Sequence, residues 1–192
     1  YNCTSLTSIT IPDGVTSIGG GTFLGCTSLT SITIPDSVTS IGHRAFWGCE
    51  SLTSITIPDS VTSIGHHAFR YTNLTSITIP DSVTSIGEQA FYSCLSLTSI
   101  TFLGTAPTVG AGAFSGVANG AVAIIPGEEH ASFGDVGDDW NGLTLDCIDG
   151  ALCWLTWTTT DRKVTITNCD EAPSGELVIP DTIGGNPVTS IG

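Results

Sequence analysis

The chain has 192 residues, of which 40% are hydrophobic, and this is enough to bury a substantial core. Charged residues make up only 11%, with 18 Asp and Glu against four Lys and Arg, so the formal net charge is -14. An acidic surface repels phosphate backbones and anionic lipid, so we expect no nucleic acid partner and no membrane-surface partner. No apolar run approaches the ~20 residues of a membrane helix, so we expect no membrane insertion within this segment.

Residues 1–116 form a tandem repeat of five copies, each about 23 residues long. The phrase LTSIT opens each copy at Leu6, Leu29, Leu52, Leu74 and Leu97. A Phe closes each copy at Phe23, Phe46, Phe69, Phe91 and Phe114, with the same spacings of 23, 23, 22 and 23. One residue is missing near Thr72 and Asn73, which explains the short interval.

Each copy carries two short extended segments and no helix-length pattern. Ile9 and Ile11 alternate with polar neighbours, the period of a strand with one face buried. Pro12 ends this strand because it has no N–H for a ladder, and Val15 and Ile18 then resume an inward-facing pattern. One copy cannot bury its own apolar side, whereas stacked copies share a continuous core. We therefore predict a mainly β solenoid with short parallel strands and little helix.

The copy from Cys26 to Cys49, CTSLTSITIPDSVTSIGHRAFWGC, resembles the leucine-rich repeats of BspA-type surface proteins of bacteria and some protists. The resemblance covers Cys3 to about Gly116 and returns in SGELVIPDTIGGNPVTSIG near the C-terminus. It implies an extracellular, cell-surface solenoid that adheres to host proteins, other cells or matrix. Pro and Asp stand where ordinary leucine-rich repeats place Asn after the strand, so an Asn hydrogen-bond ladder is not expected.

Residues 117–148 are predicted to form an irregular C-terminal cap, because terminal repeats must shield the stack from solvent. The fifth copy has already lost its Pro-Asp turn at Leu103 and Gly104. One strand is expected around Val122 to Ile125, and Phe133, Trp140 and Leu143 are expected to cover the exposed core.

Residues 149–192 are predicted to hold a β-hairpin linker module and the start of a second repeat array. The hairpin strands are expected near Leu152 to Thr158 and Lys163 to Thr167, joined at Asp161 and Arg162. The phrase VTSIG then recurs as the last five residues, ending at Gly192. Four residues ending in Phe would complete that coil before Tyr1 resumes the register, so we expect a piece cut from a longer tandem array.

The positions after each Gly and each Phe differ between copies, and they hold large polar and aromatic residues. These residues form what we call the variable strip: His43, Arg44, Trp47, His66, His67, Arg70, Glu88 and Tyr92. Arg, Trp and Tyr are the residues that most often anchor protein partners, so the strip is the predicted partner-binding site. The competing interpretation is that exposed loops simply vary.

Chemistry beyond binding has little support in the sequence. His43, His66 and Glu88 occupy equivalent positions, but such an exposed trio without further ligands makes a weak metal site. No nucleophile elbow, phosphate loop or supported Ser-His-Asp arrangement occurs. We therefore expect no enzyme, no catalytic residue, no metal and no cofactor.

Seven Cys residues fall into two groups. Cys3, Cys26 and Cys49 are in register, and Cys94, after the shortened copy, is expected one residue out of register. Either these residues form a row of small buried side chains, or two neighbours form a disulfide. In the hairpin module, Cys153 and Cys169 are the candidates for a disulfide across the paired strands.

Two functional hypotheses follow. The module either adheres to a protein or glycan on a host or neighbouring cell, or it stacks with other copies of itself as a building block of an extracellular fibre. The outward Ser and Thr rows also resemble ice-binding solenoids, although curvature would spoil that match. The sequons at Asn2 and Asn73 are candidate glycosylation sites.

Overall fold

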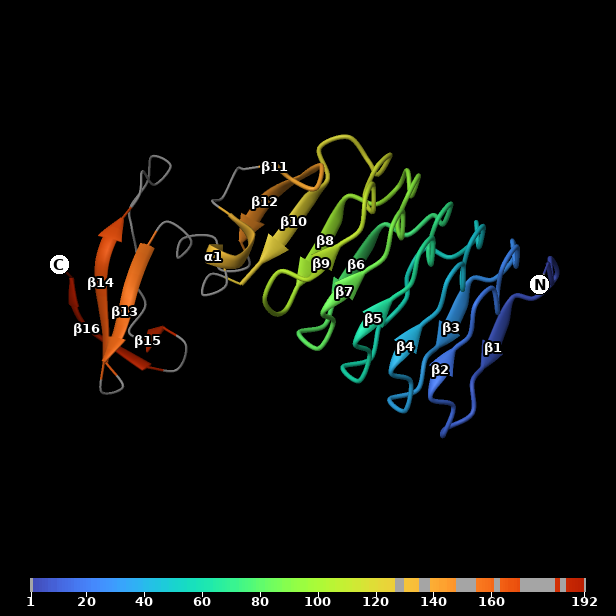
Figure 1. Ribbon diagram of the computed structural model, residues 1–192, viewed down its shortest axis with the longest axis horizontal. Helices are drawn as coiled ribbons and strands as arrows, with labels where there is room; N and C mark the ends of the chain where they lie inside the picture. Colours follow the sequence, from blue (N-terminus) through green and yellow to red (C-terminus); the bar gives the residue numbers. More distant parts are fainter. Residues whose placement is uncertain are drawn as a thin grey trace.

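The computed structural model describes residues 2–126, 130–134, 139–147, 155–160, 163–169, 182–183 and 186–191. Of residues 130–131 and of the strands after 147, only the backbone is described. The chain winds into flat coils that stack side by side, so that equivalent strands of successive copies lie next to one another (Figure 1). Helix within these ranges is limited to α1, His130–Phe133. The prediction of a mainly β solenoid with parallel strands is confirmed.

The LTSIT phrases build the first row of strands. β1 (Ser8–Thr10) pairs in parallel with β3 (Ser31–Thr33), with Ser8 opposite Ser31. β6 (Ser76–Ile79) pairs in parallel with β8 (Ser99–Phe102), again with equivalent residues opposite. This second sheet continues in parallel through β10 (Val122–Ile125) and β12 (Leu143–Cys147), and β11 (Asp139–Trp140) adds an antiparallel edge. The strand expected at Val122 to Ile125 is present.

The third copy departs from the repeat. Ser54 to Ile57 forms no strand, although its sequence, SITI, is identical to that of β6. The first row is therefore split into a two-stranded and a five-stranded sheet. The interruption falls in the copy that is one residue shorter, the missing residue lying between Phe69 and Leu74. Because the two SITI segments are identical, their surroundings rather than their own sequence determine which one forms a strand. Burial differs in the same way: Ile55 is only partly buried, whereas the equivalent Ile77 of β6 is 3% exposed.

The VTSIG phrases build an unbroken second row. The strands are β2 (Ser17–Ile18), β4 (Ser40–Ile41), β5 (Ser63–Ile64), β7 (Ser85–Ile86) and β9 (Thr108–Val109). They pair in parallel in sequence order, with Ile opposite Ile from β2 through β7. This row therefore carries the register continuously through all five copies.

The remaining strands form a separate four-stranded sheet. β13 (Leu155–Thr160) pairs antiparallel with β14 (Lys163–Cys169), which pairs in parallel with β16 (Asn186–Ile191). β15 (Thr182–Ile183) pairs antiparallel with β16. The division of the chain into 1–116, 117–148 and 149–192, and the start of a second array, stay predictions.

The core is a set of ladders of equivalent side chains from successive copies. The five repeat Phe rings stack with centroids 5.2 to 5.5 Å apart, and four of the rings are no more than 1% exposed. At the end of this stack, Trp140 lies 6.1 Å from Phe114 and 5.2 Å from Phe102, and Phe133 lies 5.0 Å from Trp140. Apolar rings thus continue beyond the last repeat.

Hydroxyl groups supply the ladder that Asn is not available to form. In the LTSIT row, the Thr30 hydroxyl donates to the Thr7 carbonyl at 3.1 Å, and Thr98 repeats the bond to Thr75. In the VTSIG row, Thr39 and Thr62 each donate to the equivalent Thr of the preceding coil. Ser37, Ser60 and Ser82 of the Pro-Asp-Ser turns likewise donate to carbonyls of the preceding coil. Three hydroxyl rows therefore join the coils.

The buried Cys row corrects one expectation. Cys94 is not out of register: its thiol donates to Phe69 O at 3.1 Å, just as the Cys49 thiol donates to Phe23 O. Thr72 takes the place of Cys in the third copy, 3.3 Å from the Cys94 sulfur. Cys26, Cys49 and Cys94 are free thiols, so no disulfide joins them. Burial raises the pKa of the Cys49 thiol to about 12 and also raises that of Cys94, which keeps both protonated.

Cys147 takes part in a disulfide whose partner is not among those three thiols. This disulfide was not predicted from the sequence; the candidate pair, Cys153 and Cys169, lies outside the described side chains. Within the ranges given above, no helix is long and apolar enough to cross a membrane.

We predict that Gly87→Ala destabilises the array, because a Cβ there would lie 2.5 Å from His66 N and 2.7 Å from Gly65 C. Backbone cannot yield as a side chain can, so we expect a loss of about 3 kcal/mol, the upper end of overpacking effects. Gly19 is the matched control, since the nearest atom to its added Cβ would be the side-chain Thr22 Oγ1 at 3.5 Å. Urea denaturation should leave Gly19→Ala near wild type, and equal loss in both variants would contradict this explanation.

Candidate partner-binding site

The variable strip lies along the corner that follows the second row of strands. In each coil the chain leaves the strand at a Gly, turns through two variable residues, and passes the buried Phe. Alternate N–H groups of this corner donate along the stack, such as Arg44 N to His66 O at 2.9 Å and Gly48 N to Arg70 O at 2.9 Å. The same corner of each coil is thereby fixed against the next, and the strip residues form neighbouring rows.

Several strip residues have an unfavourable backbone conformation. Arg44, His67 and Gln89 have φ of 54°, 56° and 52°, in the left-handed region, whereas the first and fifth copies place Gly21 and Gly112 there. A left-handed conformation costs about 1–2 kcal/mol for a residue with a Cβ and almost nothing for Gly. Copies two to four therefore keep large side chains where Gly would be more stable.

A second left-handed row lies four residues further along each corner. Here Tyr71 and Ser93 have φ of 61° and 55°, whereas the other copies place Gly25, Gly48 and Gly116. Tyr71 is 39% exposed and contacts the strip, so it belongs to the site although the sequence prediction omitted it. The signal was available, because a Tyr stands at a position where three other copies have Gly.

Arg70 is the centre of an aromatic and cationic cluster. Its Cζ lies 5.2 Å from the Trp47 ring, 4.7 Å from the Tyr71 ring and 4.4 Å from the Tyr92 ring. Its guanidinium also donates to Tyr71 OH at 2.8 Å and to the Gln89 side chain, which makes Gln89 a second residue that the sequence prediction omitted. Guanidinium groups are attracted to the faces of such rings, so this part of the surface is held in one arrangement.

Trp47 receives a second cation and joins the histidines to the cluster. Arg44 Cζ lies 4.3 Å from the Trp47 ring. The ring centroid of His67 is 5.7 Å from that of Trp47 and 5.5 Å from that of His43. The structure therefore brings the predicted Arg, Trp, Tyr and His residues into one continuous surface.

Three polar atoms in this surface are buried without a hydrogen bond to any described residue: Arg44 Nε, Arg70 Nε and His67 Nδ1. A buried polar atom without a partner costs about 1–3 kcal/mol. These costs add to the backbone strain, so two independent effects at this corner lower the stability of the folded chain.

His66 and Glu88 lie beside the cluster and form an ion pair when His66 is protonated, with His66 Nδ1 3.9 Å from Glu88 Oε2. Their side chains are 63% and 51% exposed, so the pair adds little stability. His43 neighbours His66 with ring centroids 6.5 Å apart. Among the described residues, no group of three or more His, Cys, Asp or Glu is arranged to hold a metal ion.

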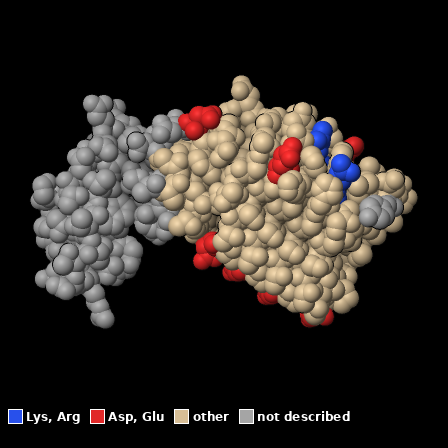
Figure 2. Space-filling view, viewed as in Figure 1, with Lys and Arg blue, Asp and Glu red and all other residues tan. Residues whose placement is uncertain are grey.

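The charge of the strip contrasts with that of the whole chain. Arg44 and Arg70 are the Arg residues of the repeat array, and both lie in the strip. Figure 2 shows the basic side chains gathered on one part of the visible face, with acidic side chains beside them and along the lower edge. Burial lowers the pKa of His67, and the neighbouring positive charges of Arg70, His43 and Arg44 lower it further.

The two sequons are exposed at Asn2 and Asn73. The Asn73 side-chain amide donates to Glu50 O at 2.7 Å, so one of its N–H groups already joins two coils. Glycosylation at either Asn stays a prediction.

Comparison with known proteins identifies the repeat. A family model described as "BspA type Leucine rich repeat region" matches residues 1–120 with six copies, one more than the five counted from LTSIT. The corner supports a sixth partial copy, since Asn2 has a φ of 55° at the position equivalent to Gly25. No curated protein matches the chain.

Solved structures of bacterial proteins share the fold. A leucine rich repeat protein from T. pallidum is 34% identical, with a TM-score of 0.56, and the match covers 64% of this chain and 60% of that one. A leucine-rich repeat protein from Bacteroides ovatus is 24% identical, with a TM-score of 0.51, covering 79% of this chain and 54% of that one. The chain thus spans little more than half the length of these two proteins.

We predict that His67 titrates below its ordinary pKa of 6.5 and that Arg70→Gln moves its pKa upward. The substitution removes the positive charge with the largest effect against protonation of the imidazole. NMR titration of the ring protons measures both values. Asp81→Asn, a charge change in the Pro-Asp turn, is the control and should leave His67 unmoved. A His67 pKa at or above 6.5 would contradict the prediction.

Proposed function

Because the chain belongs to the BspA type leucine rich repeat family, we propose that it is a non-enzymatic extracellular binding module that adheres to a protein partner through the variable strip. Tyr71 and Gln89 are included in that site. The family resemblance supports a cell-surface location and a scaffold role.

The observation that carries this proposal is the retention of large side chains at left-handed corner positions. Gly occupies the same positions in the outer copies, at Gly21 and Gly112, so the fold itself has no need of Arg44, His67 or Gln89. Strain of this kind gathers where function requires a particular side chain. Chance variation in an exposed loop would favour Gly, Asn or Asp, which tolerate the conformation.

The composition and rigidity of the strip suit a protein partner. Trp, Tyr and Arg are enriched among the residues that dominate protein interfaces. Arg70 already contacts three rings in the free molecule, so little side-chain freedom remains to be lost on binding. Low loss of freedom leaves more of the contact energy for affinity.

The test begins with a surface plasmon resonance screen against purified matrix and serum proteins. For any partner found, we predict that Trp47→Ala and Arg70→Gln each weaken binding at least tenfold, equivalent to about 1.4 kcal/mol. Leu95→Ala is the control, since Leu95 is 70% exposed and is not one of the strip residues. Circular dichroism should show that all variants keep the fold. A partner that binds both strip variants with wild-type affinity would overturn the proposed site.

A second candidate function is end-to-end stacking into a fibre, and the N-terminal coil favours it. Ile9 is 38% exposed, and it lines a depression of 210 Å³ together with Ile11, Val15 and Phe23. Val38, which is equivalent to Val15 in the next coil, is fully buried. A further coil, from a tandem module or from a second copy, would bury this surface and pair with β1 and β2 in the register used throughout the stack.

We predict that self-association, if this end serves assembly, is lost in the double variant Ile9→Lys, Val15→Lys. Two charges at this face would be buried without partners, which opposes docking. Analytical ultracentrifugation over a range of concentrations measures the effect. Leu103→Lys, at an exposed Leu of the fifth copy, is the control. A wild-type chain that stays monomeric at all concentrations would remove this candidate.

A further inference from the structure

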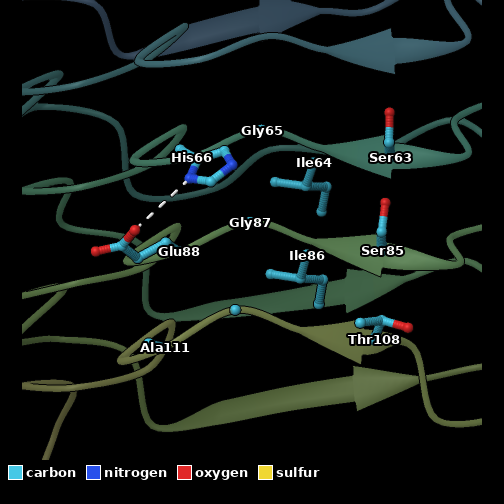
Figure 3. A pocket seen from close by; sticks show the side chains of 11 residues that line it. Ser63, Ile64, Gly65, His66, Ser85, Ile86, Gly87, Glu88, Thr108 and Ala111 are labelled. Carbon is cyan, nitrogen blue, oxygen red and sulfur yellow. Dashed lines mark ion pairs between the residues drawn. The ribbon is translucent and has the colours of Figure 1, made fainter.

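A shallow groove of 490 Å³ crosses three coils on the outer face of the second row of strands. In Figure 3 the hydroxyls of Ser63, Ser85 and Thr108 stand on one side, and His66 and Glu88 stand on the other. Between the two sides lie Gly65, Gly87 and Gly110, together with Ile64 and Ile86, which are 2% exposed. The groove is therefore a bare floor between two polar walls.

The bare floor follows from the packing of the coils. A Cβ at Gly65, Gly87 or Gly110 would lie 2.4 to 2.6 Å from backbone of the preceding coil, so no side chain fits. The N–H groups of these glycines already donate to that coil, as Gly87 N does to Ile64 O at 2.8 Å. An extended peptide could not add to this floor as a strand, because the backbone donors are in use.

The hydroxyl wall, by contrast, is not used by the fold. The side chains of Ser63, Ser85 and Thr108 form no hydrogen bond to a described residue, whereas the adjacent Thr62 and Thr84 hydroxyls donate to the preceding coil. Each free hydroxyl is a donor and an acceptor. The Ser and Thr of this wall are therefore available to a ligand at a spacing of about 4.8 Å, the distance between coils.

The two walls differ in chemistry, and together they match a polyhydroxyl ligand. The Glu88 carboxylate accepts hydrogen bonds from hydroxyls, and the half-exposed His66 imidazole can donate or accept. The two walls are three residues apart, which is roughly 10 Å along an extended chain. The floor between them presents CH groups of glycine. A sugar ring has this same distribution, with CH groups on its faces and hydroxyls around its rim.

The charge of the groove indicates which sugars it accepts. Glu88 lies in the wall, and the chain carries a net charge of -14, so carboxylated or sulfated sugars are repelled. We propose that this groove binds a neutral oligosaccharide lying along the stack, with ring hydroxyls hydrogen-bonded to Ser85 and Glu88. This site shares His66 and Glu88 with the variable strip, but it does not include the cluster of Arg70, Tyr71 and Tyr92.

The test is titration of the chain with neutral hexasaccharides of glucose, mannose and galactose, followed by NMR of the backbone amides. We expect at least one to bind, with shifts concentrated at the amides of Gly65, Gly87 and Gly110. Ser85→Ala and Glu88→Gln should each weaken binding about fivefold or more, as loss of one hydrogen bond of about 1 kcal/mol predicts. Ser40→Ala is the matched control, because Ser40 occupies the same row outside the groove.

Two further variants and two charged saccharides distinguish this proposal from the proposed protein-binding site. Ala111→Trp fills the groove and should abolish saccharide binding, whereas Arg70→Gln should preserve it even though it weakens the protein partner. Preferential binding of an oligogalacturonate or of heparin would overturn the neutral class. Failure of all neutral hexasaccharides at millimolar concentration, or shifts located away from the glycine row, would overturn the site.

Discussion

The close approach of consecutive coils is the constraint on which the structure depends. Each coil is too small to bury an apolar face alone, and it becomes stable only against its neighbours. The contact is so tight that Gly42, Gly65, Gly87 and Gly110 leave no room for a Cβ against the preceding coil. The stacked Phe rings and the hydroxyl ladders both require the same spacing, so a single distance coordinates backbone, core and surface.

That spacing also determines where variation is permitted. Residues directed into the stack are restricted to similar side chains from coil to coil, and in the Phe row to identical ones, because each packs on its own equivalent. At the corner after the second row, side chains on the outer surface do not pack on their equivalents and can differ between coils. The N–H groups of this corner must still donate to carbonyls of the next coil. The backbone there is consequently left-handed, and Arg44 or Tyr71 is retained against the conformational preference. The resulting surface is both diverse and rigid, which suits recognition.

Much of this was predictable from the sequence because repetition reveals register. The rows of Leu, Ile and Phe, the two strand segments per copy and the position of the variable strip followed from comparing one copy with another. The strand break at Ser54 to Ile57 did not, since the identical SITI of β6 forms a strand; the difference arises from neighbouring coils. The register of Cys94 was mispredicted because a constant spacing of 23 was carried across the shortened copy, whereas Cys94 stands three residues after Phe91 just as Cys49 stands three residues after Phe46. Tyr71 was omitted because only the variable positions nearest each Gly and Phe were compared.

The break in the first row at the third copy gives the array a mechanical character. On that side β3 and β6 are not joined through a strand of the third coil, while the second row runs unbroken from β2 to β9. Bending that opens the broken side separates few backbone hydrogen bonds, whereas bending the other way must stretch a continuous ladder. The stack is therefore stiff in one direction and compliant in the opposite one. A force that bends the array so as to open the first row would therefore act first at the third coil.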